Sequence, residues 1–451
     1  MWLEEAGKTI KLSLPIILGE LAQMSLHLID SAMVGAVGYK PLAAAALALS
    51  VVNIPFVFGI GMTISISQMV SMAHGRRDEN LISHYFYNGF WLCAWFALAI
   101  SLALGFGGGV LFHLGQDAEV AALALPFMRL ISLSIIPMLL FLALKHFADG
   151  LQHTRAAMTL SLCAVPLNIF LNWLLIYGNW GFPRLELNGA GWATLLTRWL
   201  IFLILGVIIL KHPKFREFTK IRGEQWKLCG RTLKELLNIG VPSGLQLGLE
   251  VGAFAVSAII IGTIDAVSLA AHQIAVTLAA MTFMISVGLS QGASIRTSHA
   301  LGRGDWRAIS VIGKSTLLIS LVFGSLCAVG FFAFRRQLPS FFNEDSSVVA
   351  LAASLLLFAA IFQISDSLQA IGAGLLRGIK DVRLPTVLIT VAYWVVGIPL
   401  GYVLAFHFDF KAVGIWLGFI AGLTFSAVVL CARFLRIARR NLIKKEEQSK
   451  L

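Results

Sequence analysis

The chain has 451 residues, of which 58% are hydrophobic and only 13% are charged, and its mean hydropathy is +0.83. A soluble globular domain has about 25% charged residues, so this composition excludes a soluble enzyme or binding domain. The net charge of +12 falls mainly in short loops and at the C-terminus, a distribution typical of membrane topology control, and we expect no nucleic-acid partner.

Apolar segments follow one another from about Lys11 to about Arg436, separated by short polar breaks. Each is long enough for the roughly 20 residues that a membrane-spanning helix needs, and the lipid bilayer is therefore an expected partner. We predict an all-α polytopic membrane protein with twelve transmembrane helices. Their centres lie near Ser25, Phe58, Ala97, Pro137, Pro166, Leu200, Leu249, Met284, Ile319, Ala360, Thr390 and Leu423.

The loops between these segments alternate between cation-rich and cation-poor, with the loop at Arg335 and Arg336 as a weak exception. The longest cation-rich loop spans residues 211–234, and the C-terminal tail is also basic. Cytoplasmic loops carry the excess of Lys and Arg, which places both termini in the cytoplasm and requires an even number of spans. We expect a multi-pass protein of the inner membrane.

The sequence contains an internal repeat. An ungapped offset of 227 residues pairs Pro15 with Pro242 and Gly61 with Gly288. It also pairs the motif at Gly75 with that at Gly302, and an offset of 228 continues the match further on. We predict an N-terminal six-helix lobe at 1–210, a cytoplasmic basic linker at 211–234 and a C-terminal six-helix lobe at 235–451. Two parallel halves are a transporter architecture, with substrate bound near the midplane between the halves.

Carboxylates deep within three apolar segments are the main candidates for function: Asp30, Glu250 and Asp366. A charge at the bilayer centre costs about 2.5–3.5 kcal/mol, so such a residue is functional by default. A carboxylate there can exchange a proton for a sodium ion or a cationic substrate. Oxygen ligands suit hard cations, and Na⁺ is therefore a candidate ligand of Glu250 and Asp366.

Polar side chains share helix faces with these carboxylates. Glu20, Gln23, His27 and Asp30 follow spacings of three and four, so they form one stripe that must face the protein interior or a water-filled cavity. Glu20 could pair with His27 or with an arginine on another helix. Further candidates for lining a cavity are Gln23, His27, Gln246, Phe362, Gln363 and Gln369.

Asn168 and Asn172 lie one turn apart on the fifth predicted helix, just after Pro166. They could ligate an ion or line a cavity, or they could only hydrogen-bond a neighbouring helix, which is worth about 0.6 kcal/mol on average. The residues alone leave both interpretations open.

Several segments resemble the multidrug and toxic compound extrusion (MATE) transporters, and in particular their bacterial NorM-like branch. The resemblance covers nearly the whole chain. It is carried by Leu28-Ile29-Asp30-Ser31-Ala32-Met33-Val34-Gly35, Pro166-Leu167-Asn168-Ile169-Phe170-Leu171-Asn172-Trp173, Ala270-Ala271-His272-Gln273, Leu375-Leu376-Arg377-Gly378 and Gly414-Ile415-Trp416-Leu417-Gly418.

The resemblance implies a V-shaped fold of two pseudo-symmetric six-helix bundles that alternate between inward-open and outward-open forms. It implies cation binding at Asp30 in the N-terminal lobe, beside Asn168 and Asn172, with Thr194 as a looser match. It also implies a C-terminal cation site at Glu250 and Asp366. Some relatives carry an aromatic hydroxyl one turn before the tenth-helix aspartate, but this chain has Phe362 there.

We therefore expect a secondary transporter that exports small amphipathic cationic drugs or toxins by antiport with Na⁺ or H⁺, acting as a monomer. The alternatives are a flippase for lipids or lipid-linked saccharides of the same superfamily and, less favoured, an ion channel. An enzyme is not expected, and no cofactor besides the coupling ion, because the chain shows no nucleophile–base pair, metal cluster or phosphate-binding loop.

Overall fold

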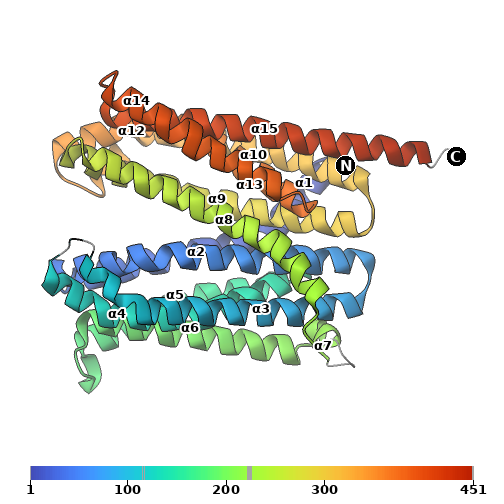
Figure 1. Ribbon diagram of the computed structural model, residues 1–451, viewed down its shortest axis with the longest axis horizontal. Helices are drawn as coiled ribbons and strands as arrows, with labels where there is room; N and C mark the ends of the chain where they lie inside the picture. The colour runs from blue at the N-terminus through green and yellow to red at the C-terminus, as the bar shows by residue number, and fades with distance from the viewer. Residues whose placement is uncertain (1, 114, 116, 221–225, 449–451) are drawn as a thin grey trace. The chain divides into compact units, whose positions relative to one another are not determined.

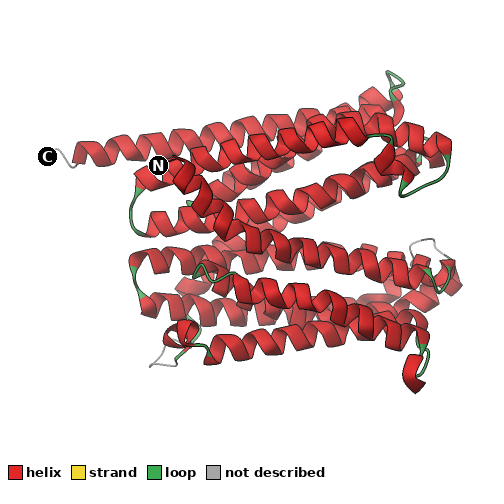
Figure 2. Cartoon of the chain, turned by 180° about the vertical axis from the view of Figure 1, so that it is seen from behind, coloured by secondary structure: helices red, strands yellow, loops and turns green. Residues whose placement is uncertain are grey.

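The computed structural model describes residues 2–113, 115, 117–220 and 226–448. Residues 221–225 of the predicted basic linker lie outside these described residues. Within the described part of the chain every regular element is a helix, and Figures 1 and 2 show long helices joined by short connections.

The helices of the two sequence repeats follow one another in the same order. The first repeat holds α1 (Trp2–Gly35), α2 (Tyr39–Arg76), α3 (Glu79–Phe106), η1 (Gly107–His113), α4 (Ala118–Gly150), α5 (Arg155–Tyr177), η2 (Asn179–Gly181), α6 (Glu186–Lys211) and α7 (Pro213–Thr219). The second holds α8 (Gly230–Gly262), α9 (Ala266–Gly302), α10 (Trp306–Phe334), α11 (Gln337–Ser340), α12 (Ser346–Gly378), α13 (Arg383–Thr390), η3 (Val391–Gly397), α14 (Ile398–Phe406) and α15 (Lys411–Gln448).

Twelve of the described segments are long and apolar enough to cross a membrane, which confirms the predicted number of spans. Each predicted centre falls inside one of them. The eleventh span, Arg383–Phe406, is interrupted by the π-helical turn η3. Such turns are rare and often mark functional sites, because the extra residue re-aims neighbouring side chains.

Aspartate side chains cap the N-termini of many of these helices. The side chain accepts a hydrogen bond from a backbone N–H of the first turn, which satisfies a donor that the helix leaves unpaired. These caps are Asp78 at α3, Asp117 at α4, Asp265 at α9, Asp305 at α10 and Asp345 at α12.

The chain divides into two compact units. We call Leu18–Gly244 the N-terminal unit, and Met1–Ile17 together with Leu245–Leu451 the C-terminal unit. The first half of α1 thus belongs to the C-terminal unit, and the first half of α8 belongs to the N-terminal unit. This division differs from one by chain order, at 1–210 and 235–451, at these two helices.

Two glycines at equivalent positions of the repeat allow close packing against these two helix halves, the first half of α8 in the N-terminal unit and the first half of α1 in the C-terminal unit. A Cβ atom on Gly61 would lie 2.1 Å from the Cα atom of Gly244, within the N-terminal unit. A Cβ atom on Gly288 would lie 2.8 Å from the Cα atom of Ile17, within the C-terminal unit. Only glycine permits such close backbone approach, so the repeated glycine has a packing reason in both units.

One helix lies at the centre of each unit. In the N-terminal unit α4 packs against α2, α3 and α6, and in the C-terminal unit α12 packs against α9, α10 and α15. The apolar stretch of α4 is 78% buried, more than that of any other described span, and the stretch of α12 is 50% buried, equal to that of α15. Buried polar groups on these two helices, such as Lys145 and Asp366, therefore face other protein groups or water.

Candidate functional site

Asp30 is the centre of a polar cluster inside the N-terminal unit. Asn172 Nδ2 donates to Asp30 Oδ1 at 2.6 Å and lies 3.0 Å from Asn168 Oδ1. Thr194 Oγ1 donates to Asp30 Oδ2 at 3.3 Å. Helices α1, α5 and α6 thus bring together the four residues that the sequence predicted for this lobe.

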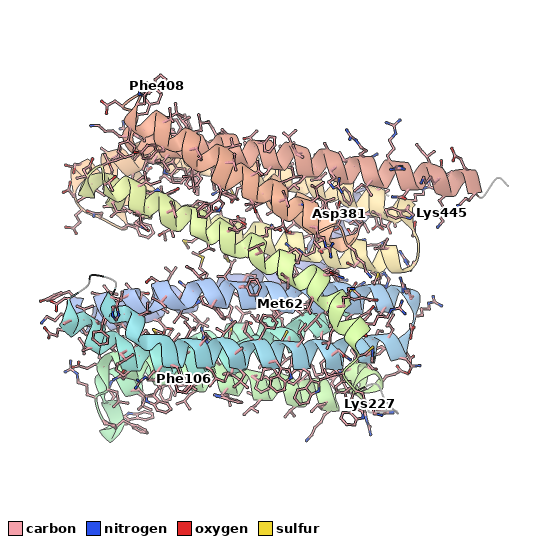
Figure 3. All side chains as sticks on the ribbon, viewed as in Figure 1. Met62, Phe106, Lys227, Asp381, Phe408 and Lys445 are labelled. Carbon is pink, nitrogen blue, oxygen red and sulfur yellow. The ribbon has the colours of Figure 1, made fainter. Side chains whose placement is uncertain are left out.

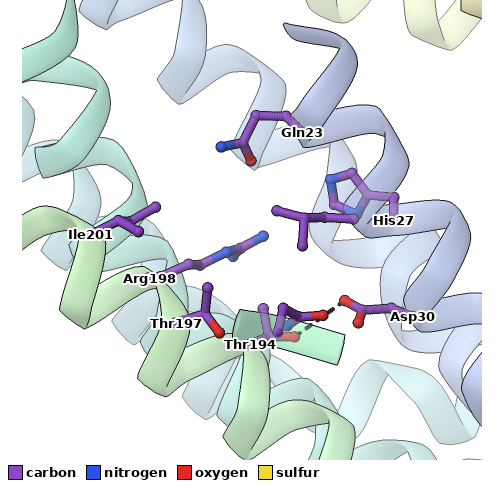
Figure 4. Close-up of a pocket in the computed structure, with 9 residues that line it drawn as sticks. Gln23, His27, Asp30, Thr194, Thr197, Arg198 and Ile201 are labelled. Atoms are coloured by element: carbon purple, nitrogen blue, oxygen red, sulfur yellow. Dashed lines mark hydrogen bonds between the residues drawn. The ribbon is translucent and has the colours of Figure 1, made fainter. Parts of the chain in front are cut away.

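A small pocket opens beside this cluster (Figure 4), and Asp30 faces it from α1 while Thr194, Thr197 and Arg198 face it from α6. A volume of about 20 Å³ is open to water-sized molecules, which is room for about one water or small ion. Its lining residues are Gln23, Leu26, His27, Asp30, Asn168, Thr194, Thr197, Arg198 and Ile201. Two of the predicted cavity-lining residues, Gln23 and His27, are among them.

Arg198 supplies the positive charge of this pocket. Its guanidinium interacts electrostatically with Asp30, and Nη1 donates to Ser134 Oγ at 2.7 Å. The same guanidinium lies over the ring of Phe56, 5.6 Å from its centroid. One carboxylate therefore faces one guanidinium, and the charges of the pocket balance.

The second candidate site lies within the C-terminal unit. Glu250 on α8 and Asp366 on α12 are both buried, and they are close enough to interact electrostatically. The hydroxyl of Tyr393, on the π-helical turn η3, donates to Glu250 Oε1 at 3.2 Å. The guanidinium of Arg377, near the end of α12, also interacts electrostatically with Glu250. The site therefore holds two carboxylates and one guanidinium, and the guanidinium interacts with Glu250.

Aromatic rings surround this site. The Phe254 ring centroid lies 6.0 Å from that of Tyr393 and 4.8 Å from that of Phe419. Phe362 packs edge-on against Phe254 at 6.1 Å and against Trp416 at 5.6 Å. Phe362 was predicted to line a cavity, and its side chain lies in this buried aromatic cluster. These rings exclude water, which strengthens the electrostatic interactions of the two carboxylates.

The three glutamines predicted for this lobe occupy different surroundings. Gln363 Nε2 donates to the backbone oxygen of Ala279 at 3.5 Å, which ties α12 to α9. Gln369 is buried one turn after Asp366, and both polar atoms of its amide have no hydrogen-bond partner among the described residues. Gln246 is buried one turn before Glu250.

Sequence reasoning missed two residues of the C-terminal site, Tyr393 and Arg377. Tyr393 lies in an apolar segment without a charged neighbour, and only the π-helical turn aims its hydroxyl at Glu250. Trp394 Nε1 donates to the backbone oxygen of Leu249 at 3.1 Å and holds this turn against α8. Arg377 lay in a segment that carried the family resemblance, but sequence could not show which carboxylate it faces.

Both sites offer oxygen donors to a hard monovalent cation. The N-terminal pocket provides carboxylate, amide and hydroxyl oxygens, and the C-terminal site provides two carboxylates and a phenol oxygen. Such donors suit Na⁺, and a buried carboxylate can also hold a proton. Within the described residues no group of three or more His, Cys, Asp or Glu side chains is arranged to hold a metal ion.

Twelve spans in two repeated halves, with buried carboxylates inside each unit, define a polytopic membrane transporter. The family model named MatE matches residues 15–174 and 242–403, one match in each repeat. The chain belongs to the MatE family, whose members are transporters and not enzymes.

Curated relatives extend this match over almost the full length. The chain is 33% identical to the probable multidrug resistance protein NorM of Mesorhizobium japonicum, covering 97% of this chain and 95% of the relative. It is also 33% identical to the protein of the same description from Brucella suis, covering 96% of this chain and 94% of that one. The crystal structure of the eukaryotic MATE transporter AtDTX14 has the same fold, with a TM-score of 0.88 at 22% identity and 98% coverage of both chains.

Proposed function

We propose that this transporter exports amphipathic cationic compounds of several kinds, and that antiport with Na⁺ or H⁺ drives the export. Relatives of full length are described as probable multidrug resistance proteins, which supports efflux as the direction and drugs or toxins as the cargo. The buried carboxylates in both candidate sites support a cationic cargo and a cationic driving ion.

The charge imbalance at Glu250 and Asp366 carries this proposal. The site holds two buried carboxylates and one guanidinium, which interacts with Glu250, so it has one excess negative charge whenever both carboxylates are ionised. An uncompensated charge is costly away from water, so the site takes up one proton or one monovalent cation. A transporter that must release and rebind a single cation in each cycle needs a site with this balance.

The Asp30 pocket is the second element of the proposal. Its carboxylate is already balanced by Arg198 and held by Asn172 and Thr194, so a cation there competes with an arginine rather than filling a deficit. We assign the driving ion first to Glu250 and Asp366, and second to Asp30. Reciprocity then requires that bound ion weaken substrate binding and that bound substrate weaken ion binding by the same factor.

We propose an orientation in the inner membrane from the distribution of charge along the C-terminal unit. In the C-terminal unit, Asp381 and Lys445 lie at one end and Phe408 lies at the other (Figure 3). The first end also holds the basic tail of α15, which the positive-inside rule places in the cytoplasm together with both termini. We propose that a single chain is sufficient for transport, because it contains both units.

Export of ethidium from proteoliposomes tests the proposal, with purified protein and an imposed sodium gradient at fixed pH. Export that follows the sodium gradient supports antiport with Na⁺, and export that requires a proton gradient supports antiport with H⁺. Independent affinities for ion and ethidium in the purified protein would contradict the coupling. Absence of ethidium export under both gradients, together with lipid translocation, would favour the flippase. Single-channel current would favour the channel.

A further inference from the structure

A second group of buried charges lies in the N-terminal unit, outside the Asp30 pocket. Lys145 Nζ on α4 donates to Glu20 Oε1 on α1 at 2.5 Å. Asp149, one turn further along α4, interacts electrostatically with both of them. The His146 Nδ1 atom lies 4.0 Å from Asp149 Oδ2. We name Glu20, Lys145, His146 and Asp149 the inner cluster.

Asp149 is the unexplained member of the inner cluster. Its side chain is 1% exposed, and neither of its carboxylate oxygens has a hydrogen-bond partner among the described residues. It also lies in the last turn of α4, where the helix dipole disfavours a negative charge. A buried ionised carboxylate without a hydrogen-bond donor is among the most costly groups in a protein, so Asp149 has a strong reason to bind a proton.

Counting charges gives the same answer. Glu20 and Asp149 supply two negative charges and Lys145 supplies one positive charge, so the ionised cluster lacks one positive charge. A proton on Asp149, or on His146 beside it, makes the cluster neutral. A sodium ion is a poor alternative for two reasons. It needs several oxygen ligands, and the ammonium of Lys145 in the same cluster would repel it.

Other titratable groups at this end of the unit have partners of their own. Tyr85 donates to Glu235 Oε2 at 2.5 Å, and Arg231 lies 3.7 Å from the same carboxylate. His74 at the end of α2 interacts electrostatically with His153. Where α2 packs against the end of α4, it presents Ser67 and Val70 to Gly150, neither of which is charged.

We propose that the inner cluster is a proton-binding site, with one exchangeable proton carried by Asp149 beside His146, at the end of the N-terminal unit that faces the cytoplasm. Glu20 holds Lys145, and the pair sets the charge that Asp149 experiences. Nothing in this proposal requires a particular drug or driving ion.

The polar stripe of α1 joins this site to the Asp30 pocket. Gln23 and His27 line the pocket and lie between Glu20 and Asp30 along the helix. Ten residues of helix separate Glu20 from Asp30, a rise of about 15 Å. The inner cluster is thus placed to pass a proton between the pocket and the cytoplasmic surface, and Glu20, which is 23% exposed, is its most accessible carboxylate.

Infrared difference spectra of the purified protein, recorded between alkaline and acidic buffer without sodium, test the proposal directly. We expect Asp149→Asn to remove one carboxylic acid band. Glu20→Gln should remove the same band although Asp149 remains, because Lys145 then balances Asp149. Asp366→Asn is the control, since it changes a buried aspartate outside the cluster and should leave this band in place.

Other outcomes would overturn the proposal. Spectra of Asp149→Asn and Glu20→Gln that keep every wild-type band would show that Asp149 takes up no proton. Loss in Asp149→Asn but not in Glu20→Gln would show an isolated acid and no shared cluster. Loss of the Asp149 band when sodium is added at fixed acidic pH would assign the site to a cation instead of a proton. These spectra involve no transported compound, so a failed efflux assay would leave their result untouched.

Discussion

The two units contain the same helices but balance their buried charges differently. In the N-terminal unit the pocket pairs one carboxylate, Asp30, with one guanidinium, Arg198. In the C-terminal unit Glu250 interacts with both a second carboxylate, Asp366, and one guanidinium, Arg377. The first arrangement is neutral without a ligand, and the second becomes neutral only when it binds a cation. The two repeats therefore share one helical arrangement, and single residues give each unit a different balance of buried charge.

The repeat shows where the difference arose. At the offset of 227 residues, Gln23 is the counterpart of Glu250, and Ser257 is the counterpart of Asp30. The two acidic side chains thus lie seven residues apart on equivalent helices, a rise of about 10 Å. Arg377 likewise has Asp149 as its counterpart at an offset of 228, so the position that carries a cation in one unit carries a carboxylate in the other.

The largest effect is expected for Asp366→Asn, which gives the C-terminal site the one-to-one balance of the Asp30 pocket. Ion-driven ethidium export should fall by at least about tenfold, because a single buried charge is worth more than about 1.4 kcal/mol to ion binding. Membrane insertion should be unchanged. Asp381→Asn, which alters an aspartate paired with Arg433 outside the site, should transport normally. Normal export by Asp366→Asn would remove the C-terminal site from the mechanism.

Replacing the arginine of each site should destabilise the protein by different amounts. Arg377→Met leaves two carboxylates uncompensated and should cost about 2–3 kcal/mol at neutral pH, whereas Arg198→Met leaves one and should cost less. Acidic pH should restore both variants, since protonation removes the stranded charges. Thermal unfolding of the purified proteins at two pH values measures the effect. Equal losses in both variants would contradict the difference in charge balance.

Tyr393→Phe tests how much one hydrogen bond contributes to ion binding at the C-terminal site. The hydroxyl donates to Glu250, and a hydrogen bond to a charged group is worth about 1.5–3 kcal/mol, so the concentration of ion for half-maximal export should change by about tenfold. Tyr177→Phe is the matched control, because its hydroxyl donates to the backbone oxygen of Met33. An unchanged ion dependence in Tyr393→Phe would place the hydroxyl outside the ion site.

The smallest effect concerns the caps of two equivalent helices. Asp265 caps α9 through Ser268, whereas its counterpart Gly38 caps α2 without a side chain. Asp265→Ala should cost about 0.5–1 kcal/mol at neutral pH.

The cap should also depend on pH. The backbone N–H of Ser268 lowers the pKa of the Asp265 carboxyl below its usual 3.8. Because the folded-state pKa is the lower one, the stabilisation is present at neutral pH and is lost as the pH falls through it. Unfolding of Asp265→Ala and the wild type should converge below about pH 4. A constant difference in stability across this range would show that the charge of Asp265 does not matter.

Sequence was sufficient for the spans and for part of the site. Apolar segment length predicted all twelve helices, and the resemblance grouped Asp30 with Asn168, Asn172 and Thr194, which the structure brings together. Contacts between distant helices could not be read in this way. Glu20 was expected to pair with His27 or an arginine, and it pairs with Lys145, because only packing decides which face of α4 meets α1.

The same limit explains the missed residues of the C-terminal site. The apolar pattern of the eleventh span is unbroken, so nothing in it predicts the π-helical turn that aims Tyr393 at Glu250. Asp366 and Arg377 are both on α12, eleven residues apart, and their connection through Glu250 depends on α8. The sequence identified the carboxylates in membrane segments, because a charge there has a high free-energy cost. It did not identify their partners on other helices.

The exchanged halves of α1 and α8 have a consequence for how the protein is made. Residues 1–17 are synthesised before the rest of their unit, which begins at Leu245, so they must wait for more than 200 residues to follow them. The N-terminal unit in turn is complete only when Gly244 has been synthesised. Domains usually fold in order as they emerge. In this protein neither half of the gene encodes a whole unit, so a chain that stops after the first repeat would leave the start of α1 without its glycine-lined partner on α9.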